Sequence, residues 1–147
     1  AIELSLALSN MVEAGYTAAA MEVSSHSLDQ GRVAALDFDV AIFTNITGDH
    51  LDYHKSFESY AEAKSKLFRS LRPEALAIVN ADDPHADRVL QGCRARVLRC
   101  SATTHAGADC FVRAEASSFD GATLGLVGPW GECSARTPLI GAFNAMN

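Results

Sequence analysis

The chain carries a run of apolar residues, Val40-Ala41-Ile42-Phe43-Thr44, that passes into a polar segment over residues 45–55 and then into a helical pattern. A short apolar run with β-branched residues is typical of a buried strand. Ser56 predicts the N-cap of the helix, and Glu58 in its first turn suits the positive end of the helix dipole. The stretch therefore predicts one strand–loop–helix unit of an α/β fold.

The same alternation repeats on both sides of this unit. We expect helices over residues 2–14, 24–30 and 84–90, and strands over residues 17–23, 76–79 and 96–99. Strands that alternate with helices in this way are typical of a parallel, doubly wound sheet. The fold class predicted from the sequence is thus α/β.

A different rhythm begins near residue 109. Short strand patterns at 111–112, 122–127 and 133–137 are separated by glycine-containing turns. This spacing predicts a small antiparallel sheet appended near the C-terminus. We expect one domain over residues 1–147, with three parts: a parallel α/β core at 1–107, the antiparallel sheet at 108–140 and the start of a further helix at 141–147.

Composition excludes several classes of protein. The chain has 147 residues, 48% of them hydrophobic, and a formal net charge of −6. This acidity, with no basic cluster, argues against a nucleic-acid surface. There is no long apolar run and no signal-peptide pattern, so we expect no membrane insertion and a cytoplasmic location. The four cysteines lack metal-site spacing, and we expect reduced thiols.

Polar residues follow the first two expected strands. Glu22 lies near the end of the first strand, and Asn45 and His50 follow the second. The carboxyl ends of parallel strands meet at one edge of a sheet, where ligands bind. A carboxylate there can hold magnesium, and imidazole can join it. Alternatively Glu22 and His26 only complete the first turn of a helix that Ser24 caps.

Lys64 lies on the apolar stripe of its predicted helix. Residues three or four apart share a face, and this stripe comprises Phe57, Tyr60, Ala61, Lys64, Leu67, Phe68 and Leu71. One interpretation is a lysine that buries its stem and hydrates its ammonium group. The other is a desolvated lysine that loses its proton, reacts with carbon dioxide and becomes a carbamate, an oxygen ligand for magnesium.

A zinc site is a further alternative for His50 and His54. Two histidines four residues apart on a helix can chelate zinc, but the hydrolase motif places glutamate directly after the first histidine. Leu51 occupies that position, and the segment has a loop pattern. The sequence therefore favours magnesium over zinc chemistry.

Taken in order, three motifs resemble the central ATPase domain of the Mur ligases. They are Met21-Glu22-Val23-Ser24-Ser25-His26 with Arg32-Val33-Ala34, then Thr44-Asn45 with Asp49-His50-Leu51-Asp52-Tyr53-His54, then Tyr60 to Phe68. The resemblance spans essentially the whole chain. Within the family it is strongest to the branch that adds diaminopimelate or lysine to UDP-N-acetylmuramoyl-L-alanyl-D-glutamate.

The resemblance implies roles for matching positions. Glu22 and His50 would bind magnesium, and Lys64 would be carbamylated and bind a second magnesium, so His50 and Lys64 would also be catalytic. Contacts to the UDP-muramyl dipeptide would come from Ser24, Gln30 and Arg32. The ATP side would be formed by Asn45, Asn144 and Asn147, the last two near the adenine.

The implied reaction forms an acyl phosphate on the substrate carboxylate from ATP, and an incoming amine then displaces phosphate to leave an amide. This is a step of peptidoglycan precursor synthesis, and the resemblance implies a monomeric parent. Two alternatives stay open: another Mur-type or folylpolyglutamate-type ligase, and a non-catalytic nucleotide-binding module.

One motif that this chemistry needs does not occur. No glycine-lysine phosphate loop is present, and Ala1 opens directly into a helical pattern. We therefore expect an excerpt of a longer ligase in which the sheet lacks its phosphate-loop strand, and we expect no ligase activity from these 147 residues alone.

Overall fold

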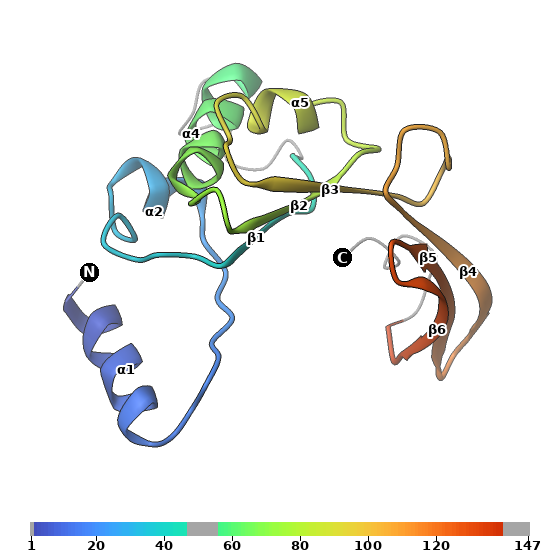
Figure 1. The fold of residues 1–147 in the computed structure, drawn as a ribbon, viewed down its shortest axis with the longest axis horizontal. Coiled ribbons are helices and arrows are strands. Elements are labelled where there is room, and N and C mark those ends of the chain that lie inside the picture. Colours follow the sequence, from blue (N-terminus) through green and yellow to red (C-terminus); the bar gives the residue numbers. More distant parts are fainter. Residues whose placement is uncertain (1, 47–55, 140–147) are drawn as a thin grey trace. The chain divides into compact units, whose positions relative to one another are not determined.

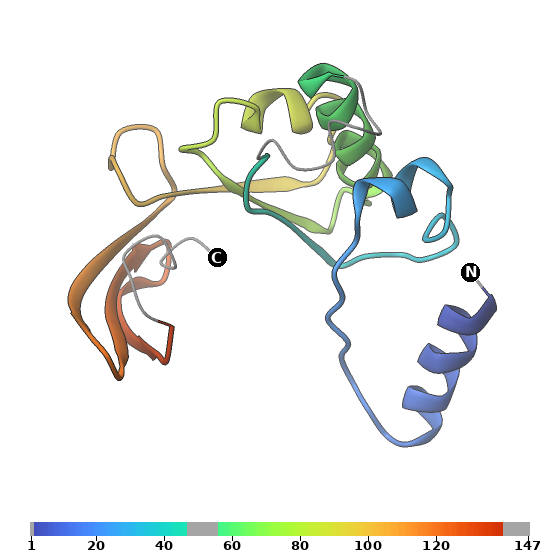
Figure 2. The same ribbon diagram turned by 180° about the vertical axis from the view of Figure 1, so that it is seen from behind.

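The computed structural model describes residues 2–46 and 56–139, and the chain divides into two compact units, residues 1–36 and 37–147 (Figures 1 and 2). The second unit contains the sheet, and the first contains two helices joined by an extended segment.

In the first unit, helix α1 (Ile2–Glu13) and helix α2 (Ser25–Asp29) occur where the sequence predicted helices. The strand expected over residues 17–23 does not form among the described residues, and this prediction was wrong. The segment is extended, and residues 17–22 are exposed. A strand needs ladder hydrogen bonds to a neighbour, and three successive alanines at 18–20 give the segment little β-propensity of its own.

The second unit begins with a parallel sheet. Its strands β1 (Val40–Phe43), β2 (Leu76–Asn80) and β3 (Arg96–Ser101) pair in sequence order. Helix α4 (Phe57–Ser70) connects β1 to β2, and helix α5 (Ala86–Val89) connects β2 to β3. Both helices cover the same face of the sheet (Figure 1). The parallel α/β pattern predicted from the sequence is confirmed.

The core lies between that face and the two helices. Alternate strand residues point into it because successive side chains of a strand lie on opposite faces. Buried members from the strands are Ala41, Phe43, Ala77 and Val79, and those from the helices and their ends include Tyr60, Ala61, Phe68, Leu71 and Val89. On the opposite face of β1, Val40 and Ile42 are exposed.

Three antiparallel strands follow: β4 (Cys110–Ser118), β5 (Gly121–Gly128) and β6 (Gly131–Thr137). The antiparallel pairing agrees with the sequence prediction. These strands continue the same six-stranded sheet, because β4 pairs in parallel with β3 through two register pairs, Cys100↔Cys110 and Ser101↔Phe111.

Hydroxyl caps set the helix starts as the sequence predicted. The Ser56 side chain accepts a hydrogen bond from the Ser59 amide at 3.2 Å. Hydrogen bonds from the backbone and from the Ser56 side chain lower the pKa of Glu58 in the first turn.

Within the described residues, no helix is both long and apolar enough to cross a membrane.

Candidate functional site

The candidate site lies at the carboxyl edge of the parallel strands. Phe43 is in register with Val79, and Asn80 is in register with Cys100, so β1, β2 and β3 end beside one another. Polar residues follow all three ends, which is where open parallel sheets bind ligands.

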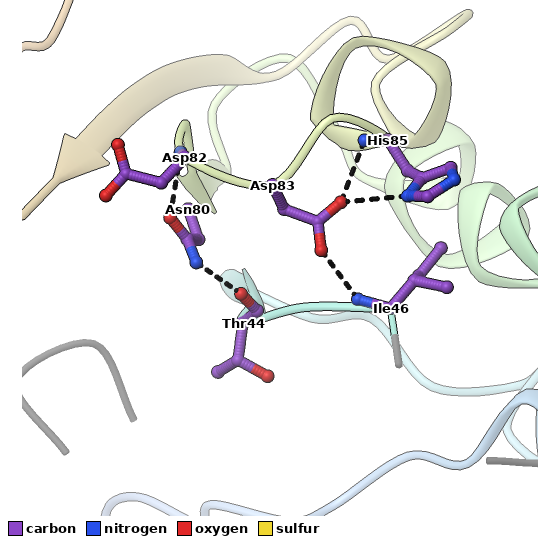
Figure 3. Close-up of polar contacts among 6 residues, drawn as sticks. All are labelled: Thr44, Ile46, Asn80, Asp82, Asp83 and His85. Carbon is purple, nitrogen blue, oxygen red and sulfur yellow. Dashed lines mark hydrogen bonds and ion pairs between the residues drawn. The ribbon is translucent and has the colours of Figure 1, made fainter. Parts of the chain in front are cut away.

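Asp83 joins the loop after β2 to the loop after β1 (Figure 3). Its Oδ2 accepts a hydrogen bond from the Ile46 amide at 2.8 Å. Its Oδ1 accepts from the His85 amide at 2.8 Å and lies 3.1 Å from the His85 ring nitrogen Nδ1. The Asp83 side chain is only 6% exposed. Both carboxylate oxygens are therefore committed to holding the two loops together.

Asn80 makes a second connection between the same loops. Its amide nitrogen donates to the Thr44 carbonyl at 2.8 Å, and its amide oxygen accepts from the Asp82 backbone amide at 2.9 Å (Figure 3). The peptide groups on both sides of Asn45 are thus fixed, one through Thr44 and one through Ile46. Asn45 is half-buried at this edge, and its backbone is positioned before any ligand arrives.

Asp82 faces the loop after β3 and points away from Asp83 (Figure 3). Its Oδ1 accepts from the Ser101 and Thr103 hydroxyls, each at 2.6 Å, and its Oδ2 accepts from the Ala102 amide at 2.8 Å. Partial burial opposes ionisation, but these hydrogen bonds outweigh it and lower the pKa of Asp82. Asp82 therefore holds the β2 and β3 ends together as a carboxylate.

Adjacent carboxylates such as Asp82 and Asp83 would ordinarily suggest a magnesium site. Here their oxygens are occupied by donors of the fold. Over residues 2–46 and 56–139, no group of three or more His, Cys, Asp and Glu side chains is arranged to hold a metal ion. Of the predicted metal ligands, Glu22 offers a carboxylate, which is a suitable ligand for magnesium. It is exposed and lies in the first unit.

Lys64 lies on α4, and the residues before and after it in the chain are buried. Ala63 is 3% exposed, Ser65 is 0% exposed, and Lys64 itself is half-buried. The Lys64 ammonium nitrogen lies 5.3 Å from the centre of the buried Tyr60 ring, within the range of a cation–π interaction. The predicted apolar stripe is largely correct, although Phe57 at its start is 38% exposed.

The start of α4 is tied to the carboxyl edge. The Phe57 and His85 rings stack with their centres 5.7 Å apart and an interplanar angle of 17°. Lys64 lies seven residues further along, about 10 Å at the rise of an α-helix. The structure thus positions α4 through the same His85 that Asp83 holds.

The predicted contacts to the nucleotide-peptide substrate lie in the first unit. Ser24 caps α2, because its side chain accepts from the Ser27 amide at 3.2 Å. Gln30 ends that helix, and Arg32 follows Gly31, whose φ is +65°. Gln30 and Arg32 are exposed, whereas Ser25 is 2% exposed. The capping interpretation of Ser24 is confirmed, and its substrate contact stays a prediction.

Three predicted site residues lie outside the described residues: His50, Asn144 and Asn147. The same holds for His54, so the zinc alternative is not tested. The described residues bring Asn45 together with the β2 loop and place Lys64 on the helix next to it.

Four residues that hold the candidate site together were not predicted from the sequence: Asn80, Asp82, Asp83 and His85. A signal was present in Asn80-Ala81-Asp82-Asp83-Pro84, which directly follows a predicted strand. Asn and Asp in such a position cap loops through their side chains.

The second unit thus contains an open parallel sheet with polar residues at its carboxyl edge and a helix that carries Lys64. Comparison with known proteins identifies a family with this fold. The family model described as "Mur ligase middle domain" matches residues 1–147, and the chain belongs to this family.

Individual relatives agree with the family match. The chain is 45% identical over 142 residues to the UDP-N-acetylmuramoyl-L-alanyl-D-glutamate–2,6-diaminopimelate ligase of Pseudomonas aeruginosa, covering 95% of the chain and 28% of that protein. It is 39% identical over 153 residues to the ligase of the same name from Bacillus cereus, covering 100% of the chain and 31% of that protein. A solved structure of such a ligase superposes with a TM-score of 0.84 at 38% identity, covering 97% of the chain and 30% of that structure. The chain therefore spans less than a third of these relatives.

Proposed function

We propose that the protein containing this chain is an ATP-dependent ligase that joins 2,6-diaminopimelate to UDP-N-acetylmuramoyl-L-alanyl-D-glutamate in peptidoglycan precursor synthesis. The observation that carries the proposal is 45% identity over 95% of the chain to a ligase of that name. Because both relatives are 2,6-diaminopimelate ligases by name, we propose diaminopimelate rather than lysine as the amine. We also propose a cytoplasmic location and a monomeric parent.

Within that ligase, the chain contributes the ATP and magnesium side of the site. Asn45, fixed through Thr44 and Ile46, contacts the nucleotide. Asn144 and Asn147 contact the adenine, because an amide can both donate to and accept from that base. Glu22, His50 and a carbamylated Lys64 hold magnesium, which when bound neutralises the crowded phosphate oxygens.

Ser24, Gln30 and Arg32 bind the nucleotide-peptide substrate. The exposed Arg32 guanidinium suits a carboxylate or phosphate because its planar fork can donate two parallel hydrogen bonds. The substrate carboxylate attacks the γ-phosphate of ATP, ADP leaves, and the amine then displaces phosphate from the acyl phosphate. The chain's own contribution is positioning and charge stabilisation, which supply most of the catalysis in phosphoryl transfer.

Carbamylation of Lys64 is part of the proposal. The Lys64 ammonium group first loses a proton. The neutral amine then forms a nitrogen–carbon bond with carbon dioxide and releases a second proton, which leaves an anionic oxygen ligand in place of the cation. The half-buried position of Lys64 on the apolar stripe of α4 supports this assignment, because burial limits hydration of the ammonium group. We also propose residues 1–107 as the parallel core, 108–140 as the antiparallel part and 141–147 as the start of the next helix.

The proposed function is tested by phosphate release from the full-length parent with ATP and magnesium. We expect release only when the UDP-muramyl dipeptide and diaminopimelate are both present, with lysine a poor replacement. Release that needs no amine would favour another branch of the family. Release that needs neither substrate would contradict the ligase assignment.

A further inference from the structure

Two cysteines face each other where the parallel and antiparallel parts of the sheet join. Cys100 lies in β3 and Cys110 begins β4, and they are register partners. Only two register pairs connect these strands, and the second is Ser101 with Phe111. One of the two residue pairs that join β3 to β4 is therefore a pair of cysteines.

The separation of neighbouring strands suits a disulfide. Adjacent strands lie about 4.8 Å apart, and the Cα atoms of bridged cysteines are usually about 4.4–6.8 Å apart. Register partners in a parallel pair also point to the same face. The two thiols are also close enough for each to affect the pKa of the other.

We propose that Cys100 and Cys110 form a dithiol site that reacts with low-molecular-weight disulfides and closes to an intrachain Cys100–Cys110 disulfide. The Cys100 thiolate attacks one sulfur of the reagent, forms a mixed disulfide and expels one reagent thiolate. The Cys110 thiolate then attacks the Cys100 sulfur and expels the second. The reagent gains two electrons and the two protons released by the cysteines, and the protein loses two hydrogens.

The exposure of the two cysteines indicates which thiol reacts first with the reagent. Cys110 is 4% exposed, whereas Cys100 is half-buried and thus easier for a reagent to reach. Burial, together with neighbouring Cys110 and Asp109, raises the pKa of Cys100 to about 11 from 9.0. The thiolate fraction at neutral pH is then lower by about a hundredfold than for an unperturbed thiol. Burial also raises the pKa of Cys110. We therefore expect a slow first attack, followed by closure within the same molecule.

Closure would fix the joint of the sheet. Ser101, the next residue after Cys100, donates its hydroxyl to Asp82 at 2.6 Å. A disulfide at Cys100 would hold β4 against the strand end that forms the candidate site. Oxidation of this pair would thus link the redox state of the protein to the rigidity of that edge.

Tryptic mapping of the full-length protein tests the proposal directly. Cleavage after Arg99 and Arg113 yields one peptide, residues 100–113, that holds both cysteines, while Cys93 and Cys133 fall in separate peptides, 89–94 and 114–136. After incubation with oxidised glutathione and alkylation, we expect the peptide 100–113 to be lighter by two hydrogens and to carry neither alkyl group nor glutathione. The Cys93 and Cys133 peptides should each carry one or the other.

Two variants sharpen this test. Cys110→Ser should stop the reaction at a glutathione adduct on Cys100, and the Cys93→Ser/Cys133→Ser double variant should leave closure unchanged. The wild-type map needs neither variant, so misfolding of Cys110→Ser leaves the test intact. Full alkylation of peptide 100–113, retained glutathione on it, or a link from it to the Cys133 peptide would each overturn the proposal.

Discussion

Asp83 fixes the candidate site through a single nearly buried carboxylate. It accepts hydrogen bonds from the amides of Ile46 and His85, which belong to different loops. The backbone around Asn45 is held in place by this side chain and by Asn80. A ligand-binding residue that is positioned in advance loses less conformational entropy on binding.

Replacing Asp83 should lower the free energy of unfolding of the protein by a measurable amount. In Asp83→Asn, one carboxylate oxygen becomes an NH₂ donor, which must then face the amide of Ile46 or of His85. We expect a loss of about 1–3 kcal/mol in the free energy of unfolding, because a nearly buried donor is left without an acceptor. Urea unfolding of the protein measures it.

Asp87→Asn is the matched control. Asp87 is 84% exposed and pairs with Arg99, so its loss should cost less than about 1 kcal/mol. Equal effects of the two substitutions would contradict the anchoring role of Asp83.

Asp82 should make stability depend on pH in the acid range. Its pKa is lowered in the folded state from 3.8. Its contribution to stability is therefore complete above pH 3.8 and is lost as pH falls from there through the lower folded pKa. We expect the acid slope of the unfolding free energy to flatten in Asp82→Asn, measured by urea unfolding across this range. An unchanged slope would exclude Asp82 as a source of acid sensitivity.

Lys64 should be modified in the parent enzyme. With carbon-13-labelled bicarbonate, we expect a carbamate signal in NMR spectra that is absent from Lys64→Ala. Loss of the ligand should lower phosphate release by about a hundredfold or more, the usual scale for removing one electrostatic contact to the reacting group. Lys66→Ala, on the exposed side of the same helix, should retain both signal and activity. Absence of the carbamate signal from the wild-type protein would contradict the assignment of Lys64 as a carbamate.

At the scale of elements, local patterns predicted what local physics determines. The apolar run at 40–44 and the cap at Ser56 gave β1 and α4 within a residue or two. The segment at 17–23 failed because its state depends on a paired neighbour rather than on its own residues. The contacts of Asn80, Asp82 and Asp83 also link distant loops, so no single window of sequence could contain them.

Two turn glycines offer a matched test of the antiparallel strands. Both have positive φ, +124° at Gly121 and +93° at Gly131. A side chain at Gly121 would also clash with the backbone carbonyl of Thr137, whereas Gly131 faces open space. We expect Gly131→Ala to cost about 1–2 kcal/mol of unfolding free energy, and Gly121→Ala more, because it adds the clash.

Thermal unfolding of the two glycine variants, each compared with the unsubstituted protein, measures this difference. If Gly121→Ala were no more destabilising than Gly131→Ala, this result would contradict the close approach of the Thr137 backbone to Gly121.

At the scale of the whole molecule, the family and its fold were recognisable from the order of three motifs, and the family match agrees. The complete site was not predictable in the same way. Glu22, Ser24, Gln30 and Arg32 belong to one unit, and Asn45 and Lys64 belong to the other, so no local stretch of sequence contains the whole predicted set.

The 147 residues alone should form no amide. No glycine-lysine phosphate loop occurs in the sequence, and ATP-dependent ligation needs such a cradle for the phosphates. We expect no product when the chain is mixed with ATP, magnesium, the UDP-muramyl dipeptide and diaminopimelate, assayed by mass spectrometry. The full-length parent serves as the positive control, and product formation by the chain alone would refute this expectation.

The most direct test of the ligase assignment is the product itself. Mass spectrometry of the parent's reaction with ATP, magnesium, the UDP-muramyl dipeptide and equal diaminopimelate and lysine should show the dipeptide extended by diaminopimelate with loss of water. ADP and phosphate should form in equal amounts with it. ATP consumption without an extended product, in the presence of both amines, would contradict the account.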